Sequence, residues 1–171
     1  MLNIYVNSWG NYNNGGAGAW ISLPMDGDML SETLGRLADR MGDNSPEWTA
    51  QAHEWSGADY GAVSEYENIF AMNSRLLGLS ELDEYEREEV AAAMEGYGYD
   101  LEEAMERQAA GLIVLFDCET LRDFAERDVE EMGLPEFAVQ YFDFEAYARD
   151  LEINGYRETS KGVVYDTHGR A

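Results

Sequence analysis

Residues 112–135 read LIVLFDCETLRDFAERDVEEMGLP, and this stretch contains the signals of both a strand and a helix. The continuous apolar run that opens it is typical of a short buried strand. Thr120 and Asp123 then have the spacing of a capping box, in which a hydroxyl and a carboxylate bind backbone N–H groups at a helix start. An apolar stripe follows at helical spacing, and the closing Gly-Leu-Pro predicts the helix end. The stretch therefore indicates a fold that contains both strands and helices.

The N-terminal region predicts a small sheet with one covering helix. Residues 2–8 alternate apolar and polar side chains, residues 18–23 form a second candidate strand after a loop rich in Gly and Asn, and residues 48–55 form a third. Between the last two, Leu30 to Met41 place apolar side chains on one helix face, with Asp26 or Asp28 as the cap. We expect a domain over residues 1–61.

The middle region, residues 62–110, predicts helices only. Ser64 with Glu67 and Ser80 with Asp83 match the capping-box spacing, so we expect one helix to start after each serine. Gly96 and Gly98 predict the end of the second helix, and a third follows from Leu101.

The C-terminal region, residues 111–171, returns to a mixed pattern. Besides the strand and helix of residues 112–135, it predicts a helix over residues 144–152 and a hairpin over residues 156–165 that turns at Lys161 and Gly162. The chain thus divides into three candidate domains: 1–61, 62–110 and 111–171.

Charge is the dominant feature of the composition. The 171 residues include 35 Asp and Glu but only 11 Lys and Arg, which gives a net charge of −24. Such a chain is repelled by nucleic acid and by anionic lipid, so a basic protein partner is the natural inference. The single cysteine, no signal-peptide pattern and no long apolar run predict a cytoplasmic protein, without nucleic acid or membrane as direct ligands.

The acids are concentrated where bases are rare. Residues 81–106 hold 11 acids and one base, and residues 41–74 hold six acids and no base. On the helix predicted after Thr120, Asp123, Glu126 and Glu130 share the face opposite the apolar stripe, at spacings of about 5–6 Å that resemble successive phosphates on a nucleic-acid strand. We therefore predict a partner-binding surface made of Glu65, Glu67, Glu81, Asp83, Glu84, Glu86, Glu88, Glu89, Glu95, Asp100, Glu102, Glu103, Glu106, Glu119, Asp123, Glu126 and Glu130.

Three other interpretations of this charge stay open. Any single acidic run is also typical of an ordinary solvated helix face, although such faces normally intersperse Lys and Arg. The acidity and the single lysine also fit the surface of a halophile enzyme. A chaperone or inhibitor of another basic nucleic-acid-binding protein would carry the same charge.

No catalytic, cofactor or metal site is predicted. His53 and His168 lack the spacing of metal ligands, and a calcium loop that started at Asp26 would need Glu where Leu37 stands. The Gly-rich loop lacks a phosphate-binding pattern. Nothing in these patterns indicates an enzyme.

The short apolar strand is also a candidate for self-association. If it lies at a sheet edge, it can pair with the same strand of a second copy. An ordinary buried strand is the other interpretation of this run; where a homodimer forms, we expect its interface to include Ile113, Leu115 and Cys118.

The two ends of the chain resemble the ArdA antirestriction family. At the N-terminus the similarity lies in Ile4-Tyr-Val-Asn7, the Gly-rich loop, Gly18-Ala-Trp20 and Pro24, and at the C-terminus in residues 141–151 and Gly155. The family's antirestriction motif falls at residues 134–144, which include Leu134, Pro135, Tyr141, Asp143 and Phe144.

The resemblance implies the fold and the activity. It implies an elongated, curved α+β chain of three small domains, with a helical middle domain and dimerisation through the C-terminal domain. It also implies a mimic of bent B-form DNA, carried by a mobile genetic element, that occupies the DNA-binding groove of type I restriction-modification enzymes in a bacterial host.

Overall fold

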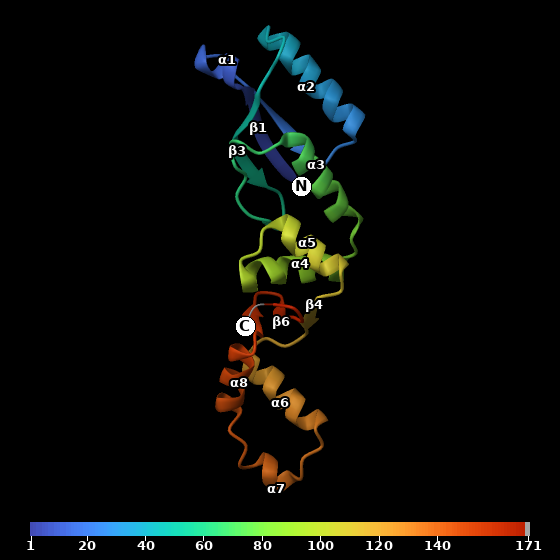
Figure 1. The fold of residues 1–171 in the computed structure, drawn as a ribbon, viewed down its shortest axis with the longest axis vertical. Helices are drawn as coiled ribbons and strands as arrows, with labels where there is room; N and C mark the ends of the chain where they lie inside the picture. The colour runs from blue at the N-terminus through green and yellow to red at the C-terminus, as the bar shows by residue number, and fades with distance from the viewer. Residues whose placement is uncertain (170–171) are drawn as a thin grey trace. The chain divides into compact units, whose positions relative to one another are not determined.

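The computed structural model describes residues 1–169 and contains two small antiparallel sheets with helices around them (Figure 1). The mixed α+β architecture and the helical middle region are as predicted. The chain divides into two compact units, Met1–Leu82 and a second unit that begins at Asp83. The three-domain division stays a prediction.

The first unit is built on a sheet of order β2-β1-β3. The strands are β1 (Leu2–Ser8), β2 (Ala19–Leu23) and β3 (Trp48–Trp55), so all three predicted strands are confirmed. The register pairs Ile4 of β1 with Ile21 of β2 and with His53 of β3. Alternate residues of β1 are fully buried, as the period-two pattern requires.

Helices complete the first unit. The predicted helix is α2 (Gly27–Met41), and Asp26 caps it by accepting hydrogen bonds from two backbone N–H groups. Its leucines enter the core, and α3 (Ile69–Glu81) packs against it. The buried Asn73 side chain holds α3 to the segment before α2, since its amide donates to the Met25 carbonyl at 2.8 Å and accepts from the Met25 N–H at 2.9 Å.

Two predicted helix starts are wrong. Helix α3 is capped by Asn68, and Ser64 instead forms a turn in which its carbonyl accepts from the Glu67 N–H. Ser80 lies inside α3, and α4 (Glu84–Tyr97) is capped by Asp83 in a capping box with Glu86. Both Ser80 with Asp83 and Asp83 with Glu86 have the spacing of a capping box, and the second pair forms it.

The second unit places helices on both faces of a sheet of order β4-β6-β5. The strands are β4 (Ile113–Phe116), β5 (Arg157–Thr159) and β6 (Gly162–Asp166), and the predicted terminal hairpin is confirmed. Neighbouring residues of β6 point to opposite faces, and Val163 and Val164 are both fully buried.

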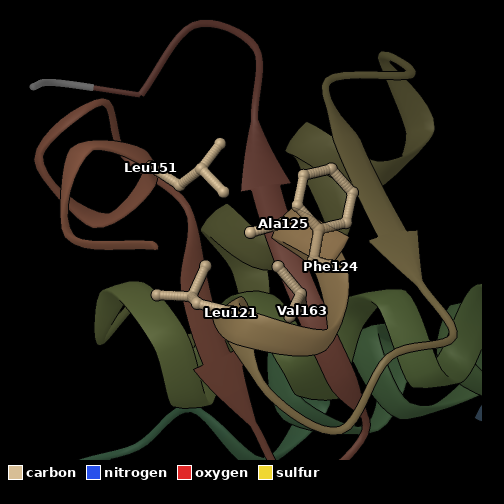
Figure 2. Packing of buried hydrophobic residues seen from close by; sticks show 5 residues of the cluster. All are labelled: Leu121, Phe124, Ala125, Leu151 and Val163. Carbon is tan, nitrogen blue, oxygen red and sulfur yellow. The ribbon is translucent and has the colours of Figure 1, made fainter. Parts of the chain in front are cut away.

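One face of this sheet packs on α6 (Leu121–Glu131) and α8 (Phe144–Ile153). Their side chains and Val163 form the cluster shown in Figure 2, which comprises Leu121, Phe124, Ala125, Leu151 and Val163. The Thr120 and Asp123 capping box that begins α6 is confirmed. Between the two helices lies α7 (Glu136–Val139), a short helix that the sequence pattern did not indicate.

The other face packs on α4, which is followed by α5 (Leu101–Ala109). A methyl group built on Gly96 of α4 would lie 2.9 Å from Val164 and 3.0 Å from the Cβ atom of Arg157, so only glycine permits this approach. The buried carboxylate of Asp166 accepts hydrogen bonds from Arg107 of α5 at 2.6 Å and from the Tyr99 hydroxyl at 2.8 Å. These contacts make α4 and α5 part of the second unit.

Candidate partner-binding surface

The predicted carboxylates differ in what each one contacts. Some cap helices, pair with bases or accept other hydrogen bonds, and others contact only solvent. All are exposed or half-buried. The sequence alone did not distinguish the groups.

Four of the predicted acids cap helices. Asp83 and Asp100 accept hydrogen bonds from backbone N–H groups in the first turns of α4 and α5. In the capping boxes of α4 and α6, Glu86 and Asp123 accept from the N–H groups of the capping residues Asp83 and Thr120. A carboxylate at a helix N-terminus stabilises the helix through these bonds and through the helix dipole. Their first role is therefore structural.

A second group of the predicted acids forms ion pairs with nearby bases. Glu67 pairs with Arg75, Glu103 with Arg107 at 2.9 Å, Glu126 with Arg122 at 3.1 Å, and Glu88 with Lys161 at 3.9 Å. Arg122 also reaches Glu145 of α8. Arg75, Arg107, Arg122 and Lys161 thus each lie beside a carboxylate.

A third group of the predicted acids accepts hydrogen bonds from neutral donors. Glu95 accepts from both the N–H and the hydroxyl of Ser160, and Glu89 accepts from the Gln108 amide at 3.1 Å. Burial raises the pKa of Glu89, and the negative charges of Glu86 and Asp83 raise it further. Carboxylates on this part of α4 are therefore close enough to repel one another.

The remaining predicted carboxylates include an open set. These side chains are exposed and bond to no other described residue, so their full charge faces solvent. The open set consists of Glu81, Glu84, Glu106, Glu119 and Glu130. Glu65 lies beside Tyr66, and Glu102, on α5, is also exposed.

Helix α6 carries the clearest row of exposed carboxylates. Asp123, Glu126 and Glu130 of α6 are all exposed, while Leu121 and Val129 of the same helix are buried. The predicted separation into an acidic and an apolar face is therefore observed. Arg122 partly neutralises the row at Glu126.

The residues predicted for a dimer interface lie in and beside β4, an edge strand of the second sheet. Ile113 and Leu115 are buried within their own unit, at 4% and 7% exposure, and Cys118 is half-buried. Burial raises the pKa of the Cys118 thiol. The Leu115 carbonyl accepts a hydrogen bond from the Tyr85 hydroxyl at 2.9 Å.

The segment predicted as the antirestriction motif surrounds α7 and divides into two parts. Asp143 caps α8 by accepting from the Ala146 N–H at 2.9 Å, and Phe144 packs against the cluster of Figure 2. Pro135 precedes α7, and Leu134 and Tyr141 on either side of the helix are exposed. Tyr141 is 84% exposed.

Exposed aromatic residues are the surface feature that the sequence argument missed. Phe137 on α7 and Tyr12 and Tyr66 in the first unit are at least half exposed. Apolar periodicity assigns aromatic side chains to the core. These residues lie in turns and short helices, and that position was the one signal that they are exposed.

Within residues 1–169, no group of three or more His, Cys, Asp or Glu side chains is arranged to hold a metal ion. In the same residues, no helix combines the length and apolar character needed to cross a membrane.

The fold and surface define an acidic α+β protein whose exposed carboxylates suit a basic partner. A family model described as antirestriction protein (ArdA) matches residues 4–165, nearly the whole chain. The chain belongs to the ArdA antirestriction family, which confirms the resemblance seen at its two ends. A search of curated proteins found no significant match.

Proposed function

We propose that the protein inhibits type I restriction-modification enzymes by occupying their DNA-binding groove as a mimic of bent B-form DNA. The observation that carries the proposal is the open set of carboxylates, Glu81, Glu84, Glu106, Glu119 and Glu130, in a chain of the antirestriction family. A groove that binds phosphates with Lys and Arg binds carboxylates by the same attraction. In this proposal the chain is an inhibitor and not an enzyme.

Physical chemistry explains how such an inhibitor competes with DNA. Phosphate contacts position a protein on DNA without reading its sequence, so a carboxylate array needs no base-like groups. An array held on folded helices is already in place. Bending DNA costs about 1–6 kcal/mol for a smoothly bent site. A mimic whose chain is curved, as the family resemblance implies, avoids that cost.

The mode of action requires that the protein and its target meet in one compartment. We place both in the bacterial cytoplasm. We also propose that two copies pair through β4, where Ile113, Leu115 and the adjoining Cys118 lie. Because the side chains of Ile113 and Leu115 are buried in their own unit, the pairing would use the backbone N–H and C=O groups at the edge of β4.

A competition assay tests the proposal. Purified protein is titrated against labelled duplex DNA bound to a type I methyltransferase core, and an unrelated DNA-binding nuclease serves as control. We expect displacement of DNA from the core but not from the nuclease. Equal displacement from both would favour a general inhibitor of basic proteins, and displacement from neither would refute the proposal.

A further inference from the structure

The first unit exposes a cluster of aromatic rings beside a carboxylate. Trp9 and Tyr12 of α1 (Trp9–Asn13) and Tyr66 of the segment before α3 form it, with Glu65 next to them. The Trp9 ring stacks on Tyr66 with centroids 6.0 Å apart and meets Tyr12 edge-to-face at 5.9 Å. We call Trp9, Tyr12, Tyr66 and Glu65 the aromatic–acid patch.

The rings of the patch are exposed although they contact one another. Tyr66 is 76% exposed and Tyr12 is 50% exposed. Since Trp9 covers only part of Tyr66, most of the Tyr66 surface faces solvent. Exposed aromatic side chains are enriched where proteins bind partners, because they offer a large contact area at low entropic cost.

Both sides of the patch are anchored to the sheet. On the α1 side, the Ser8 hydroxyl caps the helix and donates to Asp43 at 2.6 Å, and the Trp9 N–H donates to the Glu47 carbonyl at 3.0 Å. On the Tyr66 side, the buried Thr49 hydroxyl donates to the Glu65 carbonyl at 2.9 Å. The backbone that presents the rings is thus held before a partner arrives, which lowers the entropy cost of binding.

The charge around the patch selects a cationic ligand. Residues 41–74, which supply Tyr66 and Glu65, contain six acids and no base. Glu65 directly precedes Tyr66 in the chain, and the hydrogen bond to Glu65 and the charge of that carboxylate raise the pKa of Tyr66. A guanidinium group can stack on an aromatic ring and pair with a carboxylate at once.

We propose that the aromatic–acid patch docks an arginine side chain of the basic partner, with the guanidinium on the open face of Tyr66 and paired with Glu65. The inference rests on the proposed function, which supplies the basic partner. The stacking on Tyr66 adds affinity without adding a charge to the carboxylate array, so it contributes little to the salt dependence of binding, whereas the pair with Glu65 is screened like the other carboxylate contacts. The patch would anchor the partner, while the carboxylate array supplies long-range attraction.

A second exposed aromatic pair offers a matched control. Trp20 of β2 is 54% exposed and meets Tyr5 edge-to-face at 5.5 Å. Trp20 lines a hollow together with Arg36 and Arg40 of α2, so the charge beside it is opposite to that of the patch. Because Arg36 and Arg40 lie beside this pair, with Arg36 next to Glu32 at 3.8 Å, we assign the pair no role in docking.

The test measures affinity for a type I methyltransferase core at several salt concentrations. Tyr66→Ala is expected to weaken binding about fivefold or more without changing the salt dependence, because no charge is removed. Tyr66→Phe, which keeps the ring, and Trp20→Ala should both stay within about twofold of the original protein. Equal affinities for the original protein, Tyr66→Ala and Trp20→Ala would overturn the inference.

Two further measurements keep the result decisive. Circular dichroism checks that Tyr66→Ala remains folded, and Tyr12→Ala replaces it if it does not. Titration with a hexa-arginine peptide, followed by NMR at the Trp9 indole N–H, tests the patch without the enzyme. If the peptide shifts the Trp9 signal and Tyr66→Ala abolishes the shift, the patch binds arginine, even if the protein does not bind the methyltransferase core. Absence of shifts refutes it even if the core is bound.

Discussion

At the scale of single residues, the second unit depends on close contacts at its sheet. Gly96 lets α4 approach Val164 and Arg157, and Asp166 joins β6 to α5 through Arg107 and Tyr99. Neither role was visible in the sequence, where Gly96 reads only as a helix breaker. Such roles depend on which residues lie nearby in the folded structure, and the spacing of residues along the chain does not reveal those neighbours.

The first prediction concerns Gly96. Gly96→Ala should lower the free energy of unfolding by about 1–3 kcal/mol, because the new methyl group overlaps Val164 and the Arg157 stem. Gly35→Ala is the matched control in α2, where nothing lies within 4 Å of the added methyl, and it should stabilise by about 0.5–1 kcal/mol. Urea unfolding of both variants checks this, and equal effects would contradict the packing of α4.

The second prediction concerns alkaline pH. Burial, with the hydrogen bond to Asp166 and the charge of that carboxylate, raises the pKa of Tyr99 from 10.0 to about 12. The protonated phenol is therefore favoured in the folded state, and its contribution is complete below pH 10 and lost as pH rises to 12. The pKa of Tyr147 also rises to about 12, chiefly through its hydrogen bond to Asp128.

Denaturant unfolding between pH 8 and pH 12 measures this loss. The free energy of unfolding should fall above pH 10 in the original protein. In Tyr99→Phe it should be lower at pH 8, by about 1.5–3 kcal/mol for the lost hydrogen bond to the charged Asp166, which Arg107 still pairs, and it should fall less steeply above pH 10. An unchanged slope in Tyr99→Phe would contradict the assignment.

At the scale of elements, sequence patterns predicted the strands and most helices and placed some helix starts wrongly. The alternation in β1 and the apolar stripe of α6 are strong because each element buries one face. The starts of α3 and α4 failed because several polar residues in a row can cap a helix, and tertiary packing selects one of them. The short helix α7 has too few residues for a period to show.

The third prediction concerns pairing through β4. Leu115→Asp should abolish the proposed homodimer, and light scattering measures the mass. Because Leu115 is buried, the charge will also destabilise its own unit. Leu151→Asp is therefore the matched control, since Leu151 is equally buried in the second unit but lies on α8. Loss of the dimer in both variants, or in neither, would contradict an interface at β4.

At the scale of the whole molecule, composition indicated a basic partner. The structure shows which carboxylates cap helices or form ion pairs and which are open to solvent, and composition could not distinguish these. Caps and ion pairs occupy Asp83, Asp100, Glu67 and Glu103, for example, while Glu84 is open. The distinction depends on which bases lie nearby in space. Sequence therefore predicted the acidic surface as a set, and the structure is needed to assign roles within it.

The fourth prediction follows from the delocalised charge. Glu84→Gln alone should change affinity for the partner by less than about 1 kcal/mol, as for an exposed ion pair. Changing all five open carboxylates, Glu81, Glu84, Glu106, Glu119 and Glu130, to glutamine should cost about 1–5 kcal/mol while leaving the fold intact.

The control for this variant keeps the same change in net charge. Neutralising Asp28, Glu32, Asp39, Glu54 and Asp59, which lie outside the predicted surface, should weaken binding much less. Equal losses in the two variants would mean that net charge acts and that the position of the carboxylates does not.

The central claim is that carboxylates of this chain replace DNA phosphates in the groove of a type I enzyme. The most direct measurement is the affinity of the protein for a type I methyltransferase core as a function of salt concentration. The account predicts that the logarithm of the association constant falls steeply and linearly with the logarithm of salt, as it does for charge-dominated DNA binding. Binding whose affinity is independent of salt, or no binding at low salt, would contradict it.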